Sequence, residues 1–324
     1  MPKVLNFGSL NLDYVYQVSH FVKPGETLGA ESQAINAGGK GLNQSVALAK
    51  AGAEVYHAGC LGIGGEKLEK ILREYGVDTS FLIPVNQLQG NAVIQVTPSG
   101  ENSIVLFGGS NQCISEEQIN NTLSSFGEGD FLILQNEINN LPMIIDKAQA
   151  IGMVIFLNPS PFNDRLDQVE FGKLDWLLVN EIEAEQFTGE NTPEAVWQNV
   201  HNRYPKLSLL LTQGSRGSFA FRVNKASWEK EFQRAYPVKA VDTTGAGDTY
   251  TGFFISSLMK NLPLTECMRR ASMAAAISVM RSGAARSIPS AEEVEKAVLQ
   301  KMYEDREFSS RPEYLPGLAR ELMI

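Results

Sequence analysis

Short, almost continuously apolar runs alternate with longer amphipathic segments along most of this chain. Strands that are apolar at nearly every position are typical of a parallel sheet covered on both faces. Their alternation with helical segments therefore predicts an α/β fold, with a doubly wound, mostly parallel sheet and helices on both faces. The predicted strands are residues 4–7, 55–59, 131–134, 154–157, 176–179, 207–211 and 218–221, and the predicted helices are 41–51, 65–75, 116–125, 143–151, 183–188, 193–204, 249–260, 264–280 and 291–303.

Two stretches break this rhythm, residues 13–36 and 88–108. Both alternate polar and apolar residues, and the second predicts a β-hairpin around Pro98-Ser99-Gly100. Extra strands inserted into an α/β core suggest a small β lid. We therefore predict one domain over residues 1–305 that carries a lid in two pieces. The sequence assigns no role to the tail, residues 306–324.

The charge balance narrows the range of partners. The 324 residues include 28 Lys and Arg and 37 Asp and Glu, which gives a net charge of −9. Nucleic-acid and anionic-membrane surfaces need clustered Lys and Arg, so we expect neither partner. The three cysteines and three histidines lack the spacing of a metal site. The chain shows no signal-like N-terminus and no apolar run of about 20 residues, so we expect a cytoplasmic protein.

Polar residues or glycines follow almost every predicted strand. In open α/β sheets, ligands bind outside the carboxyl ends of the strands. The same residue types are ordinary in turns and helix caps, but their presence at six strand ends favours a binding site at this rim. The strand ends are Gly8-Ser9 with Asn11 and Asp13, Gly59 with Gly62, Gln135 to Glu137, Asn158-Pro159, Asn180 to Glu183, and Thr212 with Gly214 and Gly217.

The densest motif is Asp242-Thr243-Thr244-Gly245-Ala246-Gly247-Asp248, which precedes a predicted helix. Small residues let the backbone turn sharply and expose N–H groups, and the helix start adds unsatisfied donors and the positive end of its dipole. Together these features predict an anion hole suited to the charge on a transferring phosphoryl group. Asp248 either caps the helix or accepts a proton from an attacking hydroxyl.

A second glycine-rich motif, Gly38-Gly39-Lys40-Gly41-Leu42-Asn43-Gln44, also opens a predicted helix. Its glycines permit close approach of a ligand, and Lys40 and Asn43 offer donors to hydroxyls or a phosphate. The alternative is a flexible loop with a solvated lysine. The chain has no GxxxxGK[ST] motif, and Gly62-Ile63-Gly64 lacks the third glycine of a dinucleotide fingerprint because Lys67 stands there. Neither a P-loop enzyme nor a dinucleotide-dependent oxidoreductase is supported.

These two motifs resemble the two signatures of the ribokinase-like (PfkB) carbohydrate kinases. The resemblance implies a ribokinase-like fold with a β lid and ATP-dependent transfer of the γ-phosphate to a primary hydroxyl of a small neutral sugar. The favoured acceptor is D-ribose, which gives ribose 5-phosphate. The resemblance covers about residues 3–300 and includes, in order, Asn11-Leu12-Asp13, Pro24-Gly25-Glu26-Thr27, Gly76-Val77-Asp78, Asn180-Glu181-Ile182-Glu183, Thr212 to Gly217, and Gly283 to Pro289.

The resemblance also implies a role for each matching residue. Asp248 is the implied catalytic base, beside an anion hole formed by the N–H groups of Gly245, Ala246 and Gly247. The implied sugar-binding residues, besides Asp248, are Asn11, Asp13, Gly39, Lys40, Asn43 and Glu137. The implied ATP-binding residues are Asn180, Glu183, Thr212, Gly214, Ser215, Gly217 and Gly247, with Glu183 positioning Mg²⁺ through water. The implied K⁺ site lies at Asp242, Thr244, Ser278, Arg281, Gly283 and Ser287.

The chain departs from the family pattern at a few positions. Gly64 stands where the family has Asp, Gln89-Gly90 replaces Thr-Gly before the lid hairpin, and Gly109-Ser110-Asn111 stands for Gly-Ala-Asn. The first two departures lie near the expected sugar side, so fructose, deoxyribose or an adenosine-like nucleoside are alternative acceptors. Tyr14 or Tyr16 could supply the aromatic clamp that the base of a nucleoside needs. A non-catalytic sugar or nucleotide sensor is the alternative from another class. Exposed edges of the lid strands favour a homodimer formed through the lid.

Overall fold

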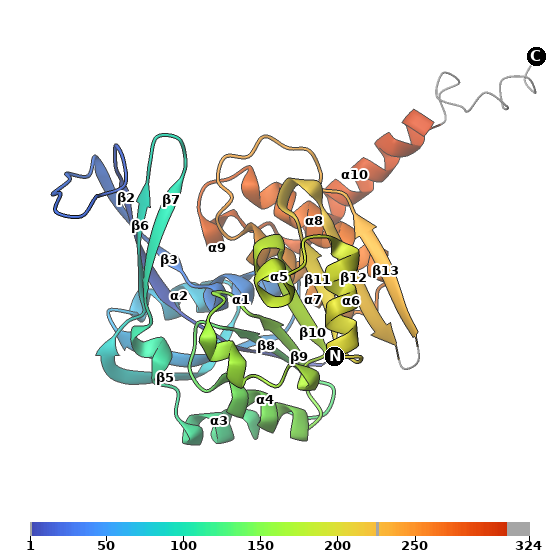
Figure 1. Ribbon diagram of the computed structural model, residues 1–324, viewed down its shortest axis with the longest axis horizontal. Coiled ribbons are helices and arrows are strands. Elements are labelled where there is room, and N and C mark those ends of the chain that lie inside the picture. Colours follow the sequence, from blue (N-terminus) through green and yellow to red (C-terminus); the bar gives the residue numbers. More distant parts are fainter. Residues whose placement is uncertain (1, 225–226, 310–324) are drawn as a thin grey trace, which may run out of the picture.

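The computed structural model describes residues 2–224 and 227–309, and a nine-stranded sheet forms the centre of its main body (Figure 1). The strand order is β13-β12-β11-β10-β9-β8-β1-β4-β5. All neighbours from β11 to β5 pair in parallel, whereas β12 and β13 are antiparallel additions at one edge. The strands are β1 (Val4–Phe7), β4 (Val55–Ile63), β5 (Asp78–Leu88), β8 (Phe131–Gln135), β9 (Val154–Asn158), β10 (Trp176–Asn180), β11 (Ser208–Thr212), β12 (Ser218–Asn224) and β13 (Ser227–Gln233).

Helices cover both faces of this sheet, as the apolar strands predict. Neighbouring strand residues point to opposite faces, so Leu132 and Ile133 of β8 belong to different buried clusters. One cluster includes α1 (Lys40–Lys50), α2 (Glu66–Glu74), α7 (Ala246–Met259), α8 (Leu264–Val279), α9 (Ala284–Ser287) and α10 (Ala291–Ser309). The other includes α3 (Glu116–Leu123), α4 (Leu141–Ala150), α5 (Glu181–Thr188) and α6 (Pro193–Arg203). The predicted fold class is confirmed.

A separate four-stranded sheet projects from the body beside α1 and α2 (Figure 1). Its order is β3-β2-β6-β7, with β2 and β6 paired in parallel and both outer pairs antiparallel. The β6–β7 hairpin turns at residues 97–100, where the sequence predicted it. This sheet fits the predicted lid, and its strands are β2 (Asn11–Gln17), β3 (Ser32–Gly38), β6 (Asn91–Val96) and β7 (Asn102–Phe107).

The sequence analysis missed two strands, β5 and β13, and both are edge strands of the large sheet. An edge strand tolerates proline and exposed polar residues, such as Pro84 of β5 and Lys230 of β13, so neither strand reads as an apolar run. At the other end of the chain, α10 continues to Ser309 and passes the predicted domain end at residue 305. The predicted tail from residue 310 onward lies outside the described residues.

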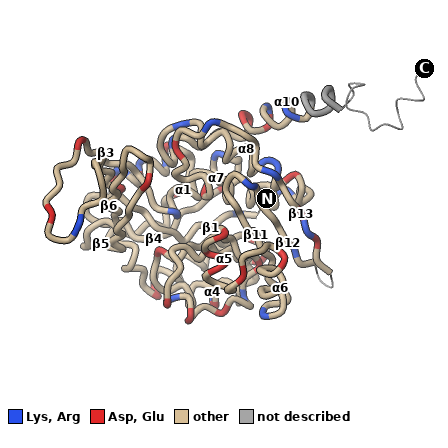
Figure 2. The backbone as a smooth tube through the Cα atoms, turned by 45° about the horizontal axis from the view of Figure 1, so that its top comes forward, with Lys and Arg blue, Asp and Glu red and all other residues tan. Residues whose placement is uncertain are grey.

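Basic and acidic positions are interspersed along the described chain (Figure 2). Among the described helices, none is long and apolar enough to cross a membrane. The η1 (Gly109–Gln112), η2 (Asp164–Gln168), η3 (Phe171–Lys173) and η4 (Gly214–Arg216) turns lie in connections between the larger elements.

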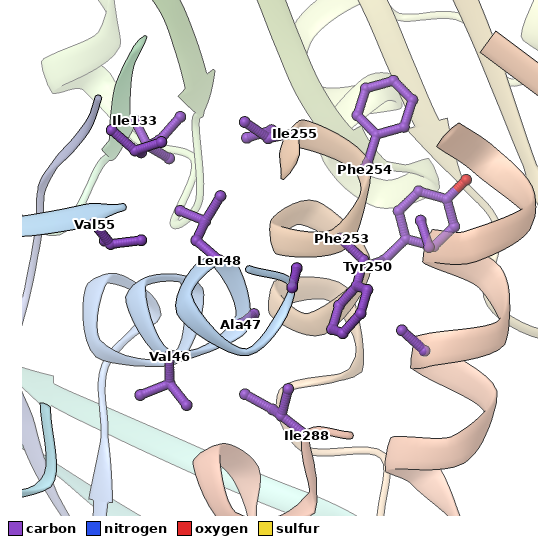
Figure 3. Packing of buried hydrophobic residues seen from close by; sticks show 14 of the residues in the cluster. Val46, Ala47, Leu48, Val55, Ile133, Tyr250, Phe253, Phe254, Ile255 and Ile288 are labelled. Atoms are coloured by element: carbon purple, nitrogen blue, oxygen red, sulfur yellow. The ribbon is translucent and has the colours of Figure 1, made fainter. Parts of the chain in front are cut away.

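Helices α1 and α7 pack against each other at very close range (Figure 3). A Cβ added at Gly252 of α7 would lie 2.4 Å from the Cβ of Ala47 and 2.8 Å from the backbone carbon of the same residue. Only a glycine therefore lets the two helix backbones come this close. Large residues such as Tyr250 and Phe253 fill the space around the contact (Figure 3).

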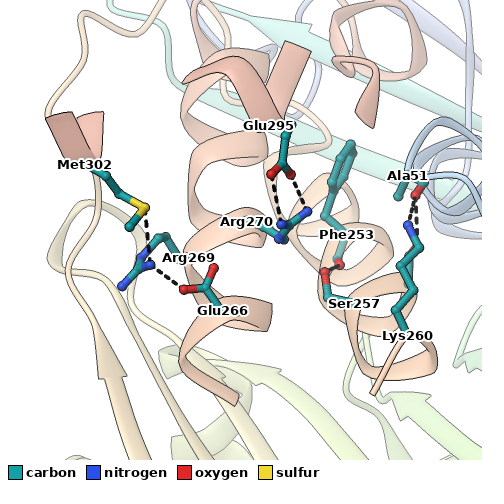
Figure 4. Close-up of polar contacts among 10 residues, drawn as sticks. Ala51, Phe253, Ser257, Lys260, Glu266, Arg269, Arg270, Glu295 and Met302 are labelled. Atoms are coloured by element: carbon teal, nitrogen blue, oxygen red, sulfur yellow. Dashed lines mark hydrogen bonds and ion pairs between the residues drawn. The ribbon is translucent and has the colours of Figure 1, made fainter. Parts of the chain in front are cut away.

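Polar contacts fasten the far ends of the same helices (Figure 4). The Ala51 carbonyl, just after α1, accepts hydrogen bonds from Ser256 Oγ at 3.0 Å and from Lys260 Nζ at 2.9 Å. Helix α10 is in turn tied to α8 by the ion pair between Glu295 and Arg270, at 2.5 Å. The end of α7 is therefore tied to the end of α1, and α10 is tied to α8.

We predict that Gly252→Ala destabilises the chain by about 1–3 kcal/mol, because the added methyl group forces α1 and α7 apart. Gly247→Ala is the matched control on the same helix, since a Cβ there meets no atom within 4 Å. Urea unfolding followed by circular dichroism measures both. Equal stability of Gly252→Ala and wild type would contradict the close contact.

Candidate active site

The crevice at the carboxyl ends of the strands opens at β1. The strand order reverses there, since β4 and β5 lie on one side of β1 and β8 to β13 on the other. Such a switch point separates the loops after neighbouring strands and leaves room for a ligand. The start of α1 lies directly on the loop after β1, because a Cβ on Gly41 would lie only 2.3 Å from the Ser9 nitrogen. The two glycine-rich motifs thus meet at this rim through α1 and α7.

Asp248 lies in the first turn of α7 and is held from α1. Asn43 Nδ2 donates to Asp248 Oδ2 at 3.0 Å, and Gln44 Nε2 donates to Asp248 Oδ1 at 2.9 Å. The residue is only 8% exposed. The N-cap of α7 is Gly245, and no side chain caps the helix. The sequence left two roles open for Asp248, a helix cap and an acceptor of the hydroxyl proton. The structure does not show the helix cap.

The predicted anion hole borders a cavity of about 230 Å³. Gly245 has a φ of 74°, and a Cβ there would lie 3.2 Å from the Cβ of Ala284, so the turn requires glycine. A Cβ on Gly247 would meet open space, which leaves this backbone accessible to a ligand. The Ala246 N–H, also predicted for the hole, donates to the Thr243 carbonyl at 3.2 Å. The cavity is lined by Lys40, Asn158, Leu178, Val179, Asn180, Glu183, Leu210, Thr212, Thr243, Gly245, Ala246, Gly247, Asp248 and Thr251.

Lys40 carries a positive charge near acidic groups of three segments, the start of α7, the segment after β8 and the start of α5. Burial alone would lower the pKa of Lys40, but the carboxylates of Asp248, Glu137 and Glu183 raise it above its ordinary value. The ammonium group therefore stays protonated. Lys40 was predicted to hold a sugar hydroxyl, and its place in the wall of the 230 Å³ cavity also puts it beside the predicted phosphate path.

Asp13 adds a further carboxyl group near Glu137 and Asp248. Burial, with the neighbouring charges of Glu137 and Asp248, raises the pKa of Asp13 to about 7. Burial also raises the pKa of Glu137, although Lys40 and the Ser9 hydroxyl oppose the shift. Glu137 is fixed in place, because its Oε2 accepts hydrogen bonds from Ser9 Oγ and, at 3.1 Å, from the Lys40 N–H. Concentrated acidic groups of this kind suit the recognition of hydroxyls.

A second cavity, of about 270 Å³, lies under the end of lid strand β7. It includes Asn11 and Glu137 of the predicted sugar residues, whereas Asp13, Gly39 and Asn43 line neither cavity. Two amide oxygens near these residues, Asn43 Oδ1 and Asn136 Oδ1, are buried and have no hydrogen-bond partner among the described residues. The other lining residues are Leu106, Phe107, Gly108, Asn111, Gln112, Asn136, Pro161, Asn163 and Arg165.

The predicted nucleotide residues are only partly brought together. Asn180 and Glu183 line the 230 Å³ cavity and form a capping box, in which each side chain accepts from the other's backbone N–H. Thr212 lines the same cavity, but Gly214, Ser215 and Gly217 lie in and after η4 and do not. Gly217 has its own structural reason to be glycine, since a Cβ there would lie 2.3 Å from the Gln233 carbonyl oxygen.

The predicted K⁺ residues gather around the loop before α7. The Asp242 carboxylate accepts N–H bonds from Thr244 and Gly283, both at 2.9 Å. Partial burial alone would raise the pKa of Asp242, but these bonds hold it below its ordinary value. The Ser278 carbonyl accepts from the Arg281 N–H at 3.0 Å, and Ser287 Oγ donates to the Ala284 carbonyl at 2.8 Å. A carboxylate among backbone carbonyls is an oxygen donor set that fits a hard cation.

The sequence analysis missed three side chains that hold the predicted ones in place. Ser9 fixes Glu137, Gln44 fixes Asp248, and Gln135 donates to Gln44 Oε1 at 2.8 Å. Gln44 stood in the second glycine-rich motif and Gln135 at the end of a predicted strand, and neither was given a role. Their contacts join elements far apart in the sequence, so no local spacing predicts them.

The comparison with protein families supports the sequence resemblance. The model of the pfkB family carbohydrate kinase matches residues 1–291. The ribokinase of Haemophilus influenzae is 36% identical over 304 residues, which cover 90% of this chain and 97% of that protein. The deoxyribokinase of Salmonella typhi is 30% identical over 302 residues, which cover 88% and 95%. Among solved structures, Arabidopsis thaliana ribokinase complexed with ribose and ATP matches with a TM-score of 0.78 and 28% identity, over 92% of this chain and 98% of that one.

We predict that Asp13→Asn changes how stability depends on pH in the ligand-free protein. The folded chain keeps a proton on Asp13 up to about pH 7, whereas the unfolded chain loses it near its ordinary pKa of 3.8. Asp13 therefore contributes a loss of stability as pH rises from about 4 to 7, and Asp13→Asn removes this contribution.

Urea unfolding at several pH values measures the difference. Between pH 4 and 7, Asp13→Asn should gain at least about 1.4 kcal/mol relative to wild type, the worth of one pKa unit. Exposed Asp167→Asn should follow the wild-type slope. Parallel curves for Asp13→Asn and wild type would show that Asp13 is ionised in the fold.

Proposed function

Because this chain belongs to the pfkB family of carbohydrate kinases, we infer that it transfers the γ-phosphate of ATP to the primary hydroxyl of a sugar, and we propose D-ribose as the acceptor and ribose 5-phosphate as the product. Relatives named ribokinase and a structural neighbour complexed with ribose and ATP support this substrate pair. The observation that carries the proposal is the carboxylate of Asp248, held beside the glycine turn of Gly245 to Gly247 at the start of α7.

In the proposed mechanism, Asp248 takes the proton of the sugar hydroxyl. The hydroxyl oxygen forms its bond to the γ-phosphorus as the bond to the β–γ bridging oxygen breaks, and ADP leaves with that electron pair. Phosphoryl transfer depends mainly on positioning and charge stabilisation. Lys40 and the backbone N–H groups of Gly245 and Gly247 would provide the positive field for the moving phosphoryl group, whereas the Ala246 N–H, also predicted for the hole, is bonded to the Thr243 carbonyl.

We assign sugar binding to the groups around the 270 Å³ cavity and the lid. Asn11, Asp13, Gly39, Asn43 and Glu137 would hold hydroxyls, as the sequence predicted. The unpartnered Asn43 Oδ1 supports this assignment, because a buried acceptor without a partner costs free energy that a sugar hydroxyl would recover.

We assign ATP and Mg²⁺ to the 230 Å³ cavity. Among the described residues, no cluster of three or more His, Cys, Asp or Glu could hold a metal ion by itself. Mg²⁺ would enter with the ATP phosphates, and Asn180 and Glu183 would contact it through water. The rest of the nucleotide would contact Thr212, Gly214, Ser215 and Gly217.

We also propose a K⁺ ion at the loop of Asp242 and Thr244, with Ser278, Arg281, Gly283 and Ser287 on its other side. The oxygen donors gathered there support a monovalent cation, whose charge would strengthen the adjoining anion hole. The cytoplasmic location expected from the sequence belongs to the same proposal.

The acceptor is tested by ADP release across pentoses, hexoses, deoxysugars and nucleosides, with and without K⁺. We expect ribose to have the highest kcat/KM and K⁺ to raise the rate. Deoxyribose is the second candidate, because a deoxyribokinase is 30% identical to this chain. A higher kcat/KM for deoxyribose or a nucleoside would overturn the ribose assignment, and no ADP release with any acceptor would favour the sensor.

Asp248→Asn should lower kcat by about 10²–10⁴-fold, the usual worth of a general base. Ribose-dependent thermal shifts should persist, because the amide still fits the site. The matched control Asp167→Asn, on an exposed turn, should keep wild-type turnover. Full activity of Asp248→Asn would show that another group accepts the proton.

We propose that the lid pairs with the lid of a second copy of this chain. Both faces of β7 are exposed, and Val105 reaches 65% exposure, so one face remains for a partner when the other covers the sugar. The exposed apolar residues of the lid strands are Ile35, Val93, Ile104, Val105, Leu106 and Phe107.

Val105→Glu should convert a dimer to a monomer in size-exclusion chromatography with light scattering, since symmetry places two added charges at one interface. Ile151→Glu is the control, at an exposed apolar position outside the lid. A wild-type monomer, or an intact dimer in Val105→Glu, would contradict pairing through the lid.

A further inference from the structure

We propose that Gln44 and Gln135 are positioning residues for Asp248, and that a buried chain of side-chain amides fixes the direction of its carboxylate. The inference rests on the proposed role of Asp248 as the base. Neither glutamine lines the 230 Å³ or the 270 Å³ cavity, so both would act through Asp248 rather than through a substrate.

The chain of hydrogen bonds runs from α7 into the centre of the sheet. Gln44 Nε2 donates to Asp248 Oδ1 at 2.9 Å, and Gln135 Nε2 donates to Gln44 Oε1 at 2.8 Å. Gln135 Nε2 also donates to Asn6 Oδ1, at 3.0 Å. Asn6, Gln44 and Gln135 are each 0% exposed, so no solvent competes for these bonds.

A backbone group fixes the orientation of all three side-chain amides in this series of hydrogen bonds. Asn6 Nδ2 donates to the Gly41 carbonyl at 2.8 Å, and a carbonyl can only accept. Asn6 must therefore present its oxygen to Gln135, and Gln135 in turn must present its nitrogen to Gln44. Gln44 is left with its nitrogen toward Asp248. Turning any one amide over would place two acceptors or two donors against each other.

The hydrogen bonds at Asn6, the end of the series farthest from Asp248, are equally constrained. Asn6 Nδ2 also donates to Ser45 Oγ at 2.8 Å, and Ser45 Oγ lies 2.8 Å from His57 Nδ1. Burial lowers the pKa of His57 to about 4, so the ring is neutral and Nδ1 can accept the Ser45 hydroxyl hydrogen. Asn6 thus keeps both of its amide hydrogens bonded inside the core.

The arrangement of Gln135 carries a cost that packing alone would not require. Its Oε1 is buried and has no hydrogen-bond partner among the described residues. An apolar residue of similar size would avoid this penalty. Gln135 instead uses both amide hydrogens, on Asn6 and Gln44, which is the use expected of a group that orients Gln44.

Orientation matters because the base must aim one oxygen at the sugar hydroxyl. Asn43 Nδ2 holds Asp248 Oδ2, and Gln44 Nε2 holds Oδ1. The two amides differ in their support, because Gln44 Oε1 accepts a hydrogen bond from Gln135, whereas Asn43 Oδ1 has no partner among the described residues. Displacement of a catalytic group by about 1 Å can cost about 10²-fold in rate.

The test compares Gln44→Met and Gln135→Met with Gln118→Met. Gln118 is another buried glutamine, but its amide donates to the Gly59 carbonyl at 2.7 Å and takes no part in the hydrogen bonds between Asn6, Gln135, Gln44 and Asp248. We expect kcat to fall about 10–100-fold in Gln44→Met and less in Gln135→Met, with KM for sugar and ATP within about threefold. Gln118→Met should keep the wild-type kcat.

A double-mutant cycle separates positioning from general loss of structure. If Gln135 acts through Gln44, the double variant should have the kcat of Gln44→Met alone. Independent, multiplying effects would overturn the proposal, as would a kcat within twofold of wild type in both single variants. If Gln44→Met does not fold, Gln135→Met compared with Gln118→Met decides by the same split of kcat from KM.

Crystal structures of the variants test the inference without turnover. The Asp248 carboxylate should rotate in Gln44→Met and keep its place in Gln118→Met. An unmoved carboxylate in Gln44→Met would overturn the positioning role. If the wild-type chain phosphorylates no sugar, the proposed function fails, and these structures still decide whether Gln44 orients Asp248.

Discussion

The close contact between α1 and α7 is the constraint on which the site depends. The backbones meet at Gly252 and Ala47, and the Ala51 carbonyl fastens the far ends of the helices. Both helices therefore begin at the same point of the rim. That arrangement places Lys40 and Asn43 of one glycine-rich motif beside Asp248 of the other. Asn43 and Asp248 are 205 residues apart in the sequence.

The electrostatics of the site follow from this convergence. The carboxyl groups of Asp13, Glu137 and Asp248 share a largely buried space with the side chain of Lys40. Burial, and after it repulsion from Glu137 and Asp248, raises the pKa of Asp13 to about 7, so a negative charge on Asp13 costs free energy in the fold. In the proposed function, the hydroxyls of a sugar would give these carboxyl groups hydrogen-bond partners, and the phosphates of ATP would lie near Lys40. The −9 net charge of the chain is therefore compatible with an anionic cosubstrate, because the positive field is local.

The sequence predicts the large elements well, because apolar runs and glycine-rich turns are local signals. It predicts the parallel sheet, the lid hairpin and both motifs, and it misses β5 and β13 because edge strands carry polar residues and Pro84. The roles of Gln44 and Gln135 cannot be predicted in this way, since they depend on which strands become neighbours. Gly217 shows the opposite case: its place in a family motif suggests ligand binding, while its contact with the Gln233 carbonyl already requires glycine.

The proposed mechanism requires Asp248 to face the acceptor hydroxyl at the junction of α1 and α7. A crystal structure of this chain with ribose and a non-hydrolysable ATP analogue tests this requirement directly. We expect an Asp248 carboxylate oxygen to lie within hydrogen-bond reach, about 2.6–3.2 Å, of the ribose 5-hydroxyl. The γ-phosphate should lie beyond that hydroxyl, at the turn of Gly245 to Gly247. A ribose bound with its 5-hydroxyl away from Asp248, or next to another carboxylate, would contradict the role of Asp248 as the base.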